Sequence, residues 1–403
     1  MFTKHFAHSR RSRTHLHWVT VLLVSITSIL AIPNLGRAQG SVGPADVQQA
    51  IDTLVQYFRL NQNRQAKEGP VGAWQGHPDQ KTGLTCLVVL SLLSAGRKPS
   101  DPEVARALDY IRGETPEQVY EASLHTMVLC AAEPGRDLPL IQRNVLWLLR
   151  AQQLDGGWGY RLERGYSDES NSQFAVLALW EASRVGVEIP QEAIALGRKY
   201  WLDKMSSGGT WGYRGEPKPR GSMVCAGLAS MLILEDALST QDASVQGEQI
   251  RCCGNIQQME YDPEKSLDWL ARNFSVVQNP GYGEWYLYYM YALERVGRLT
   301  GQRFIGDHDW YREGCEAIVG PKNSKLNQVS QGSGALQPAA ARAMALLFLS
   351  KGKRQVVIGQ LQHTLDANNR DWNHHRRSIQ HLTDRKSTRL NSSHEWISRM
   401  PSS

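Results

Sequence analysis

The stretch Arg143-Asn-Val-Leu-Trp-Leu-Leu-Arg-Ala-Gln-Gln-Leu-Asp-Gly-Gly-Trp158 decides the fold of this chain. Its first part, residues 143–152, spaces apolar residues three and four apart, which predicts an amphipathic helix. Gly156 and Gly157 then predict a tight turn, because glycine adopts backbone conformations that other residues avoid. Residues 170–186 follow as a second and more apolar helix. The stretch therefore predicts a hairpin made of an outer and an inner helix.

Five weaker copies of this hairpin occur along the chain. Their outer helices are predicted at residues 45–61, 101–112, 191–205, 263–274 and 309–319, and that of the best copy at 138–152. Their inner helices are predicted at residues 82–96, 121–132, 221–234, 284–297 and 337–352. Strand-type alternation is nearly absent, so we expect an all-α fold of about six helix pairs. The period alone does not decide whether the pairs stack as an open superhelix or close into a ring.

Composition and charge are those of an ordinary globular protein. Of the 403 residues, 41% are hydrophobic and 21% are charged, and the formal net charge is +6. Residues 1–38 hold five basic residues and no acid, and residues 385–403 hold four basic residues against one acid. Residues 39–384 therefore carry a net charge of −2. A body so close to neutral gives no electrostatic reason to expect nucleic acid as a partner.

The N-terminus has the order of a secretory signal peptide. A basic start leads into an apolar run at residues 18–32, and Gly36-Arg37-Ala38 offers small residues before a cleavage point. The run is shorter than the roughly 20 residues that a spanning helix needs. We therefore predict residues 1–38 to be a signal peptide and the protein to be periplasmic or in the cell envelope. An uncleaved N-terminal anchor is the alternative, and no later segment is expected to be long and apolar enough to span a membrane.

The six cysteines predict no metal centre. Cys86, Cys130 and Cys225 lie in apolar helical runs, where a free cysteine acts as a small core residue. There is no Cys-x-x-Cys pair, so we expect neither a structural zinc site nor any other cofactor. Cys252 and Cys253 lie in a Gln- and Ser-rich insertion, and whether either forms a disulfide stays open.

The best copy of the hairpin resembles the QW motif of squalene and oxidosqualene cyclases. The matching positions are Arg143, Trp147, Gln152, Gly156 and Trp158. Degenerate copies carry Trp74, Trp211 and Trp285. The resemblance implies the (α/α)6 toroid of the terpenoid cyclase and protein prenyltransferase superfamily, over about residues 45–352. In that family the tryptophan stacks against the neighbouring repeat and the glutamine ties the outer helix to the next turn.

The wider pattern is similar to exported bacterial proteins with prenyltransferase and squalene-oxidase repeats. We expect a toroid domain at residues 39–355, followed at 356–384 by the start of a C-terminal domain of unknown function. Residues 385–403 resemble translated vector or adapter DNA, because the same tail occurs on unrelated proteins. We interpret that tail as non-native and the chain before it as truncated.

Three reactions known on this toroid leave signatures that the sequence lacks. Cyclisation needs an Asp-x-Asp-Asp acid, and the nearest run, Asp307-His-Asp309, reads as a helix cap. Protein prenylation needs a zinc site with an Asp-x-Cys pair, which does not occur. The thioester proteins need Cys-Gly-Glu-Gln, and Gly314-Cys-Glu-Ala317 lacks the second glycine and the glutamine. The sequence therefore assigns no catalytic residue.

The polar residues near the starts of the inner helices are the candidates for a binding site. In related folds these ends gather at one mouth of a central cavity, and helix N-termini there suit anions. The residues we expect to bind in the cavity are Asp168, Asn171, Gln173, Arg220, Tyr282, Glu284 and His125, with Lys81, Tyr120 and Glu121 beside them. A purely structural role is the alternative, in which Asp168 and Asn171 cap a helix, the tyrosines pack between repeats and His125 is a core residue.

Two functions follow from these observations. The first is a non-catalytic binding or scaffold module that uses the toroid cavity for an unidentified ligand or partner protein. The second is a degenerate or uncharacterised enzyme of the terpenoid-cyclase class that acts on a lipid or glycan. Phenylalanine is scarce, at seven residues, whereas a cyclase needs many aromatic rings to stabilise cations. This favours the first function.

Overall fold

The computed structural model describes residues 42–74, 82–163, 165–239, 244–246, 249–251, 261–320 and 338–350. The chain divides into two compact units, Met1–Ser41 and Val42–Ser403. The predicted signal peptide, the segments 356–384 and 385–403, and the Cys252-Cys253 pair lie outside the described residues.

Outer and inner helices alternate along the second unit, and their order follows the predicted hairpins. The outer helices are α2 (Pro44–Leu60), α4 (Pro102–Gly113), α6 (Pro134–Ala151), α8 (Gln191–Asp203), α10 (Pro263–Arg272) and α12 (Trp310–Val319). The inner helices are α3 (Gly83–Ser94), α5 (Val119–Ala132), α7 (Glu169–Arg184), α9 (Gly221–Ser239), α11 (Tyr286–Leu299) and α14 (Pro338–Leu349). A 3-10 turn, η1 (Ala66–Glu68), follows α2.

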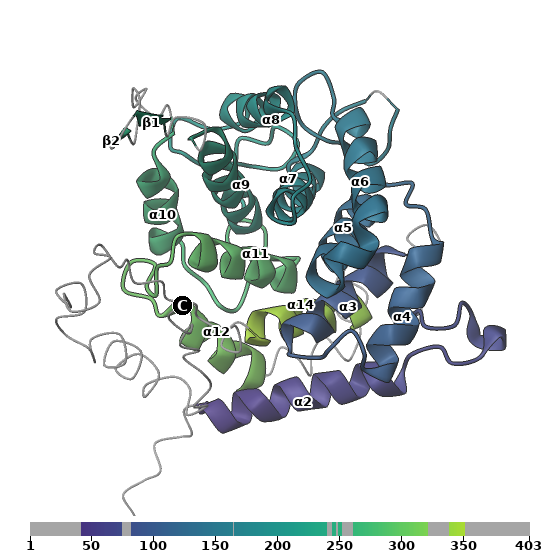
Figure 1. Ribbon diagram of the computed structural model, residues 1–403. Helices are drawn as coiled ribbons and strands as arrows, with labels where there is room; N and C mark the ends of the chain where they lie inside the picture. Colours follow the sequence, from purple (N-terminus) through teal and green to yellow (C-terminus); the bar gives the residue numbers. More distant parts are fainter. Residues whose placement is uncertain are drawn as a thin grey trace, which may run out of the picture. The chain divides into compact units, whose positions relative to one another are not determined.

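The inner helices contact one another in a closed order. The contacts run from α3 to α5, α7, α9, α11 and α14, and α14 returns to α3. Figure 1 shows the outer helices α2, α4, α6, α8, α10 and α12 placed around this inner set. An open superhelix would leave the first and last inner helices apart. The described hairpins therefore form an all-α (α/α) toroid, as predicted.

Burial separates the two kinds of helix. The outer helix α2 buries one stripe, formed by Ile51, Leu54 and Phe58. The inner helix α3 instead buries every residue from Gly83 to Leu92. Helices that are apolar all round belong in an interior, because they contact neighbours on every side. The hydrophobic core formed by the described residues therefore lies among and around the inner helices.

Three tryptophans form the corners between the outer and inner helices. The indole N–H of Trp74 donates to the carbonyl of Phe58 at 2.9 Å, and that of Trp158 donates to Leu148 at 2.8 Å. Trp211 repeats the bond with the carbonyl of Trp201 at 2.8 Å. Each acceptor lies in the last turn of an outer helix, where carbonyls lack a partner within the helix. One buried ring thus satisfies the helix end and fills the corner.

A glutamine ties each of two corners to the next outer helix. Gln152 donates from Nε2 to the carbonyls of Gly156 and Ala193, at 2.9 and 3.0 Å. Gln62 does the same for Gly72 and Glu103, at 2.9 and 2.7 Å. Glu103 and Ala193 stand in the first turns of α4 and α8, so each amide joins consecutive hairpins. Arg143 and Trp147 lie on α6, where Arg143 donates to the carbonyl of Glu114 at 3.1 Å and Trp147 is partly buried against the core.

The prediction that Trp285 is a corner tryptophan is wrong. Its side chain is 40% exposed, and it stands directly before α11 with a positive φ of 59°. Trp74, Trp158 and Trp211 lie nine to eleven residues before their inner helices, which gives the chain room to fold back. The buried tryptophan that packs against α11 is Trp310, the first residue of α12, and a Cβ on Gly297 of α11 would lie 2.0 Å from its ring.

One inner helix has the composition of a membrane span. Among the described residues, Gly221–Leu238 in α9 is long and apolar enough to cross a bilayer. The expectation that no segment after the signal peptide would meet this criterion is therefore wrong. In the structure 72% of that stretch is buried, and α9 contacts α7 and α11 in the ring and α8 and α10 outside it. Its apolar content is that of a core helix.

The insertion after α9 holds the only strands among the described residues. β1 (Ser244–Gln246) pairs antiparallel with β2 (Gln249–Arg251), with Val245 opposite Ile250. The sequence pattern predicted no strand at these positions. Each strand has three residues, too few to produce a recognisable alternation.

Candidate functional site

The predicted mouth residues gather where α5, α7, α9 and α11 begin. Asp168, Asn171 and Gln173 lie at the start of α7, and all three side chains are buried. The guanidinium of Arg220, just before α9, lies 3.9 Å from the ring centre of Tyr282 and 5.3 Å from that of Tyr213. Four of the seven predicted residues, Asp168, Asn171, Arg220 and Tyr282, are joined through Arg214 and Tyr213 into one set of contacts, which we call the mouth, and Gln173 lies below it on α7.

Asp168 is the N-cap of α7. Its Oδ1 accepts from the backbone N–H of Asn171 at 2.9 Å and from the hydroxyl of Ser170 at 2.5 Å, and its Oδ2 accepts from the Asn171 amide at 2.9 Å. Such a cap satisfies backbone donors that have no partner within the helix. The neighbouring Glu169 is also buried, and its Oε2 accepts the N–H of Arg214 at 2.8 Å. Burial raises the pKa of Glu169, although the bond from Arg214 opposes the shift.

Aromatic side chains fill the interior of the ring beneath the mouth. The ring of Phe174 on α7 lies 4.9 Å from that of Tyr120 on α5. It also stacks with two rings of α11, at 6.4 Å from Tyr288 and 6.0 Å from Tyr291. Because α9 separates α7 from α11 in the ring, these contacts cross its interior. We call these four residues the central aromatic cluster.

Polar groups of the central aromatic cluster are also paired. The amide of Gln173 donates to the hydroxyl of Tyr288. Arg295, one turn further along α11, is buried and donates to the hydroxyl of Tyr291 at 2.8 Å. Burial raises the pKa of Tyr120 and Tyr288, so both hydroxyls stay protonated at neutral pH. Side chains from three inner helices therefore close the centre at this level.

Arg214 is a mouth residue that the sequence pattern did not predict. Its guanidinium carbon lies 5.3 Å from the ring centre of Tyr213, 5.9 Å from Tyr166 and 6.0 Å from Tyr160. A nitrogen of the same group lies 3.9 Å from Oδ2 of Asp168. A short sequence repeat could have indicated this cluster, because residues 158–160 and 211–213 are both Trp-Gly-Tyr. The same position of two consecutive corners thus supplies Tyr160 and Tyr213.

Glu284 and His125 also lie outside the mouth contacts. Glu284 is exposed, and among the described residues no hydrogen bond or ion pair ties it to the others. His125 lies in the middle of α5 and is buried against outer helices, so its placement in the cavity is wrong. Its Nε2 bonds the carbonyl of Ile111 on α4 at 2.8 Å, and its Nδ1 bonds the amide of Asn144 on α6 at 2.7 Å. Lys81 lies outside the described residues, and Glu121 accepts the N–H of Thr82 at 3.5 Å.

The bonds of His125 require a neutral ring. A carbonyl only accepts, so Nε2 carries the proton, and Nδ1 then accepts from the Asn144 amide. Burial lowers the pKa of His125 to about 4, from about 6.5 in an unfolded chain. Between these values the unfolded chain binds more protons, so the free energy of unfolding falls as the pH falls.

We expect wild type to lose about 2 kcal/mol of stability between pH 7 and pH 5 through His125 alone. Urea unfolding at the two pH values measures this loss. His125→Gln keeps a donor and an acceptor but does not titrate, so its pH dependence should be weaker. His308→Gln, at a half-buried histidine beside Glu313, is the control and should behave as wild type. Equal pH dependence in wild type and His125→Gln would contradict the assignment.

Comparisons with known proteins bear on the fold. No family model and no curated protein matches the sequence. The structure is similar to that of the type II terpene cyclase MstE from Scytonema in its apo form, with 11% identity and a TM-score of 0.45 over 77% of this chain and 99% of that chain. An apo variant of MstE has 12% identity and a TM-score of 0.45, and a variant in complex with geranylgeranyl dihydroxybenzoate has 11% and 0.44. Each of these covers 77% of this chain and 97% of the other. At such identity the activity of this chain has to be argued from its own residues.

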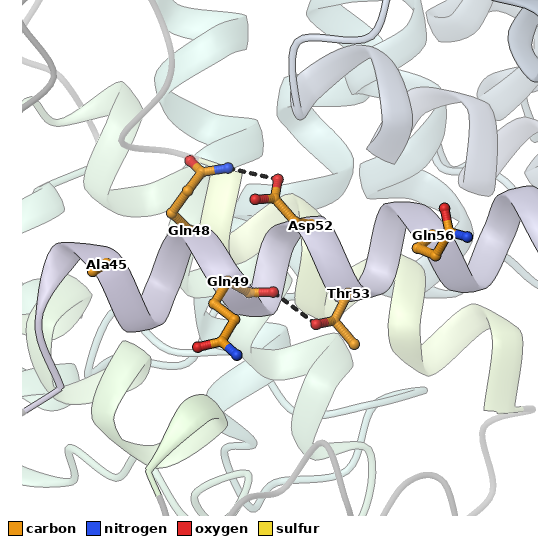
Figure 2. A pocket seen from close by; sticks show the side chains of 6 residues that line it. All are labelled: Ala45, Gln48, Gln49, Asp52, Thr53 and Gln56. Carbon is orange, nitrogen blue, oxygen red and sulfur yellow. Dashed lines mark hydrogen bonds between the residues drawn. The ribbon is translucent and has the colours of Figure 1, made fainter.

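The structure also contains a surface hollow that lies away from the mouth. Figure 2 shows it along the exposed face of α2, lined by Gln48, Gln49, Asp52 and Thr53 with Ala45 and Gln56. Gln48 donates to Asp52 at 2.7 Å, and Thr53 donates to the carbonyl of Gln49 at 2.7 Å. All six residues are exposed and belong to one helix, so the hollow is open.

No group of three or more His, Cys, Asp or Glu side chains suited to a metal ion occurs within the described part of the chain.

Proposed function

We propose that this chain is an exported, non-catalytic binding or scaffold module that contacts its ligand or partner at the mouth of the toroid. The filled centre of the ring carries this proposal. A cyclase encloses its substrate in a wide cavity among the inner helices, whereas the central aromatic cluster here joins Tyr120, Phe174, Tyr288 and Tyr291 across that space. A ligand then has access to the mouth and not to the interior.

The role of Asp168 supports the same proposal. A catalytic acid must hold a proton that it can transfer to the substrate. Both oxygens of Asp168 instead accept hydrogen bonds from Ser170 and Asn171, as those of an N-cap do. Export is proposed from the signal-like N-terminus, and a scaffold role from the expected C-terminal domain. The corner tryptophans and glutamines fit the proposal that these corners are QW motifs.

One observation favours the alternative, an uncharacterised enzyme of the terpenoid-cyclase class. Glu169 is buried at the mouth, and burial raises the pKa of its carboxyl group. A carboxyl with a raised pKa can act as a general acid near neutral pH. The alternative requires the central aromatic cluster to part and admit a substrate.

Incubation of the full chain with squalene and geranylgeranyl substrates separates the two functions. We expect gas chromatography with mass spectrometry to show no cyclised product for wild type. Cyclised product that disappears in Asp168→Asn or Glu169→Gln would overturn the non-catalytic proposal. Glu192→Gln, an exposed position on α8, is the matched control and should behave as wild type in either case.

A further inference from the structure

The turn that holds Arg214 has an unusual backbone for its sequence. The N–H of Glu216 donates to the carbonyl of Tyr213 at 3.1 Å, which closes a four-residue turn. Both central residues have positive φ, 53° at Arg214 and 77° at Gly215. Glycine, asparagine and aspartate favour this conformation, whereas a long side chain adopts it only at a cost in conformational free energy. Arg214 is therefore held in place by its contacts.

Those contacts surround a cation. The three tyrosine rings within about 6 Å of the guanidinium attract a positive charge through their π faces. Asp168 supplies a buried carboxylate at 3.9 Å from the same group. A cluster of this composition suits an organic cation, and in this chain the bound cation is the guanidinium group of Arg214.

The cluster is open to a ligand from outside. Tyr166 is 80% exposed, Tyr160 is 41% exposed, and the side chain of Arg214 is itself 47% exposed. Next to Asp168, the amide oxygen of Asn171 is buried and accepts no hydrogen bond within the described residues. An unsatisfied buried acceptor favours a ligand that carries N–H groups.

We propose that Tyr160, Tyr166, Tyr213 and Asp168 form a cage for the guanidinium group of a ligand, and that Arg214 occupies this cage when the ligand is absent. The ligand displaces Arg214 and takes over its ring and carboxylate contacts. This inference rests on the proposed function, because the cage is part of the mouth.

Arg214→Gly tests the cage directly, since glycine keeps the positive φ of the turn while it removes the internal occupant. The probe is N-acetyl-arginine amide, titrated into the full chain by calorimetry. If Arg214 fills the cage about nine-tenths of the time, emptying it lowers the apparent Kd about tenfold. The matched control is Arg184→Ala, which uncovers the single ring of Trp180 at the other end of α7 and should bind as wild type does.

Further variants and probes identify the site and the ligand chemistry. In the Arg214→Gly background, Tyr166→Leu should abolish the gain, and Tyr166→Phe should keep it because a π face remains. The neutral isostere N-acetyl-citrulline amide should not bind. The proposed cage would be contradicted if the gain in affinity survived Tyr166→Leu, or if Arg214→Gly bound the probe no more tightly than Arg184→Ala. Tetramethylammonium has no N–H groups, and an equal gain with it would overturn the assignment to a guanidinium.

This experiment and the turnover assay fail independently. Loss of the cage leaves the absence of cyclised product unchanged, so the proposed function would stand with another ligand. Cyclised product from wild type would overturn the proposed function whatever the calorimetry shows.

Discussion

Trp211→Ala is expected to lower the free energy of unfolding by about 3–5 kcal/mol, the usual cost of removing a fully buried tryptophan. The ring of Trp211 is buried between α8 and α9, where it contacts the rings of Trp201 and Tyr261. A Cβ on Gly227 would lie 2.3 Å from it, so the inner helix carries a glycine to admit the ring. The substitution leaves a cavity and also removes the hydrogen bond to the carbonyl of Trp201.

Urea unfolding followed by circular dichroism measures this loss, and Trp285→Ala is its control. Trp285 has the same side chain and also follows a glycine-rich segment, but it is 40% exposed. Its replacement should cost less than about 1 kcal/mol, in the range of surface substitutions. Equal losses in the two variants would contradict the assignment of Trp211 as a corner.

Gly156→Ala is expected to cost at least about 3 kcal/mol, since two penalties combine. The φ of Gly156 is +89°, where a residue with a Cβ is strained. That Cβ would also lie 2.0 Å from the carbonyl oxygen of Leu196, a backbone atom of α8 that cannot rotate away. Relief of the clash would push the corner away from the next outer helix.

Gly186→Ala separates the two penalties of that substitution. Gly186 follows α7 with a φ of +90°, almost the same as that of Gly156, and a Cβ there would meet nothing within 4 Å. Its replacement should cost only the strain of the backbone, about 1–2 kcal/mol. Unfolding free energies measured in urea for both variants give the contribution of the contact by difference. If the two losses agree, close packing of the corner on α8 does not contribute to stability.

The local elements of the fold could be predicted because their signals are local. Apolar spacing and the glycine and tryptophan positions of residues 143–158 predicted α6, its corner and the helix that follows. Asp309 was interpreted as a cap, and its side chain accepts the N–H of Arg312 at the start of α12. The prediction that Trp285 is a corner tryptophan failed because Trp285 stands directly before α11, which leaves no room for the chain to fold back. Residue types alone do not reveal this loop length.

The candidate site could be predicted only in part. Helix starts were visible in the sequence, so Asp168, Asn171 and Gln173 were found. His125 was placed on the correct helix but on the wrong side of it, because α5 is apolar all round and its sequence does not show which side faces the axis. Arg214 was missed because its role depends on tyrosines from separate loops that only the folded chain brings together.

The amino-acid sequence by itself determined the helical hairpins, their number and the three corners at Trp74, Trp158 and Trp211, because these depend on contacts between residues close in the chain. The hairpin period left open whether the hairpins close into a ring, and the tertiary structure shows the closure that the motif resemblance implied, since α14 meets α3 after the small rotations of all intervening hairpins have added up. The same closure brings Phe174 of α7 to Tyr288 and Tyr291 of α11. Whether the centre is empty or filled was therefore decided by side chains that lie more than a hundred residues apart in the sequence.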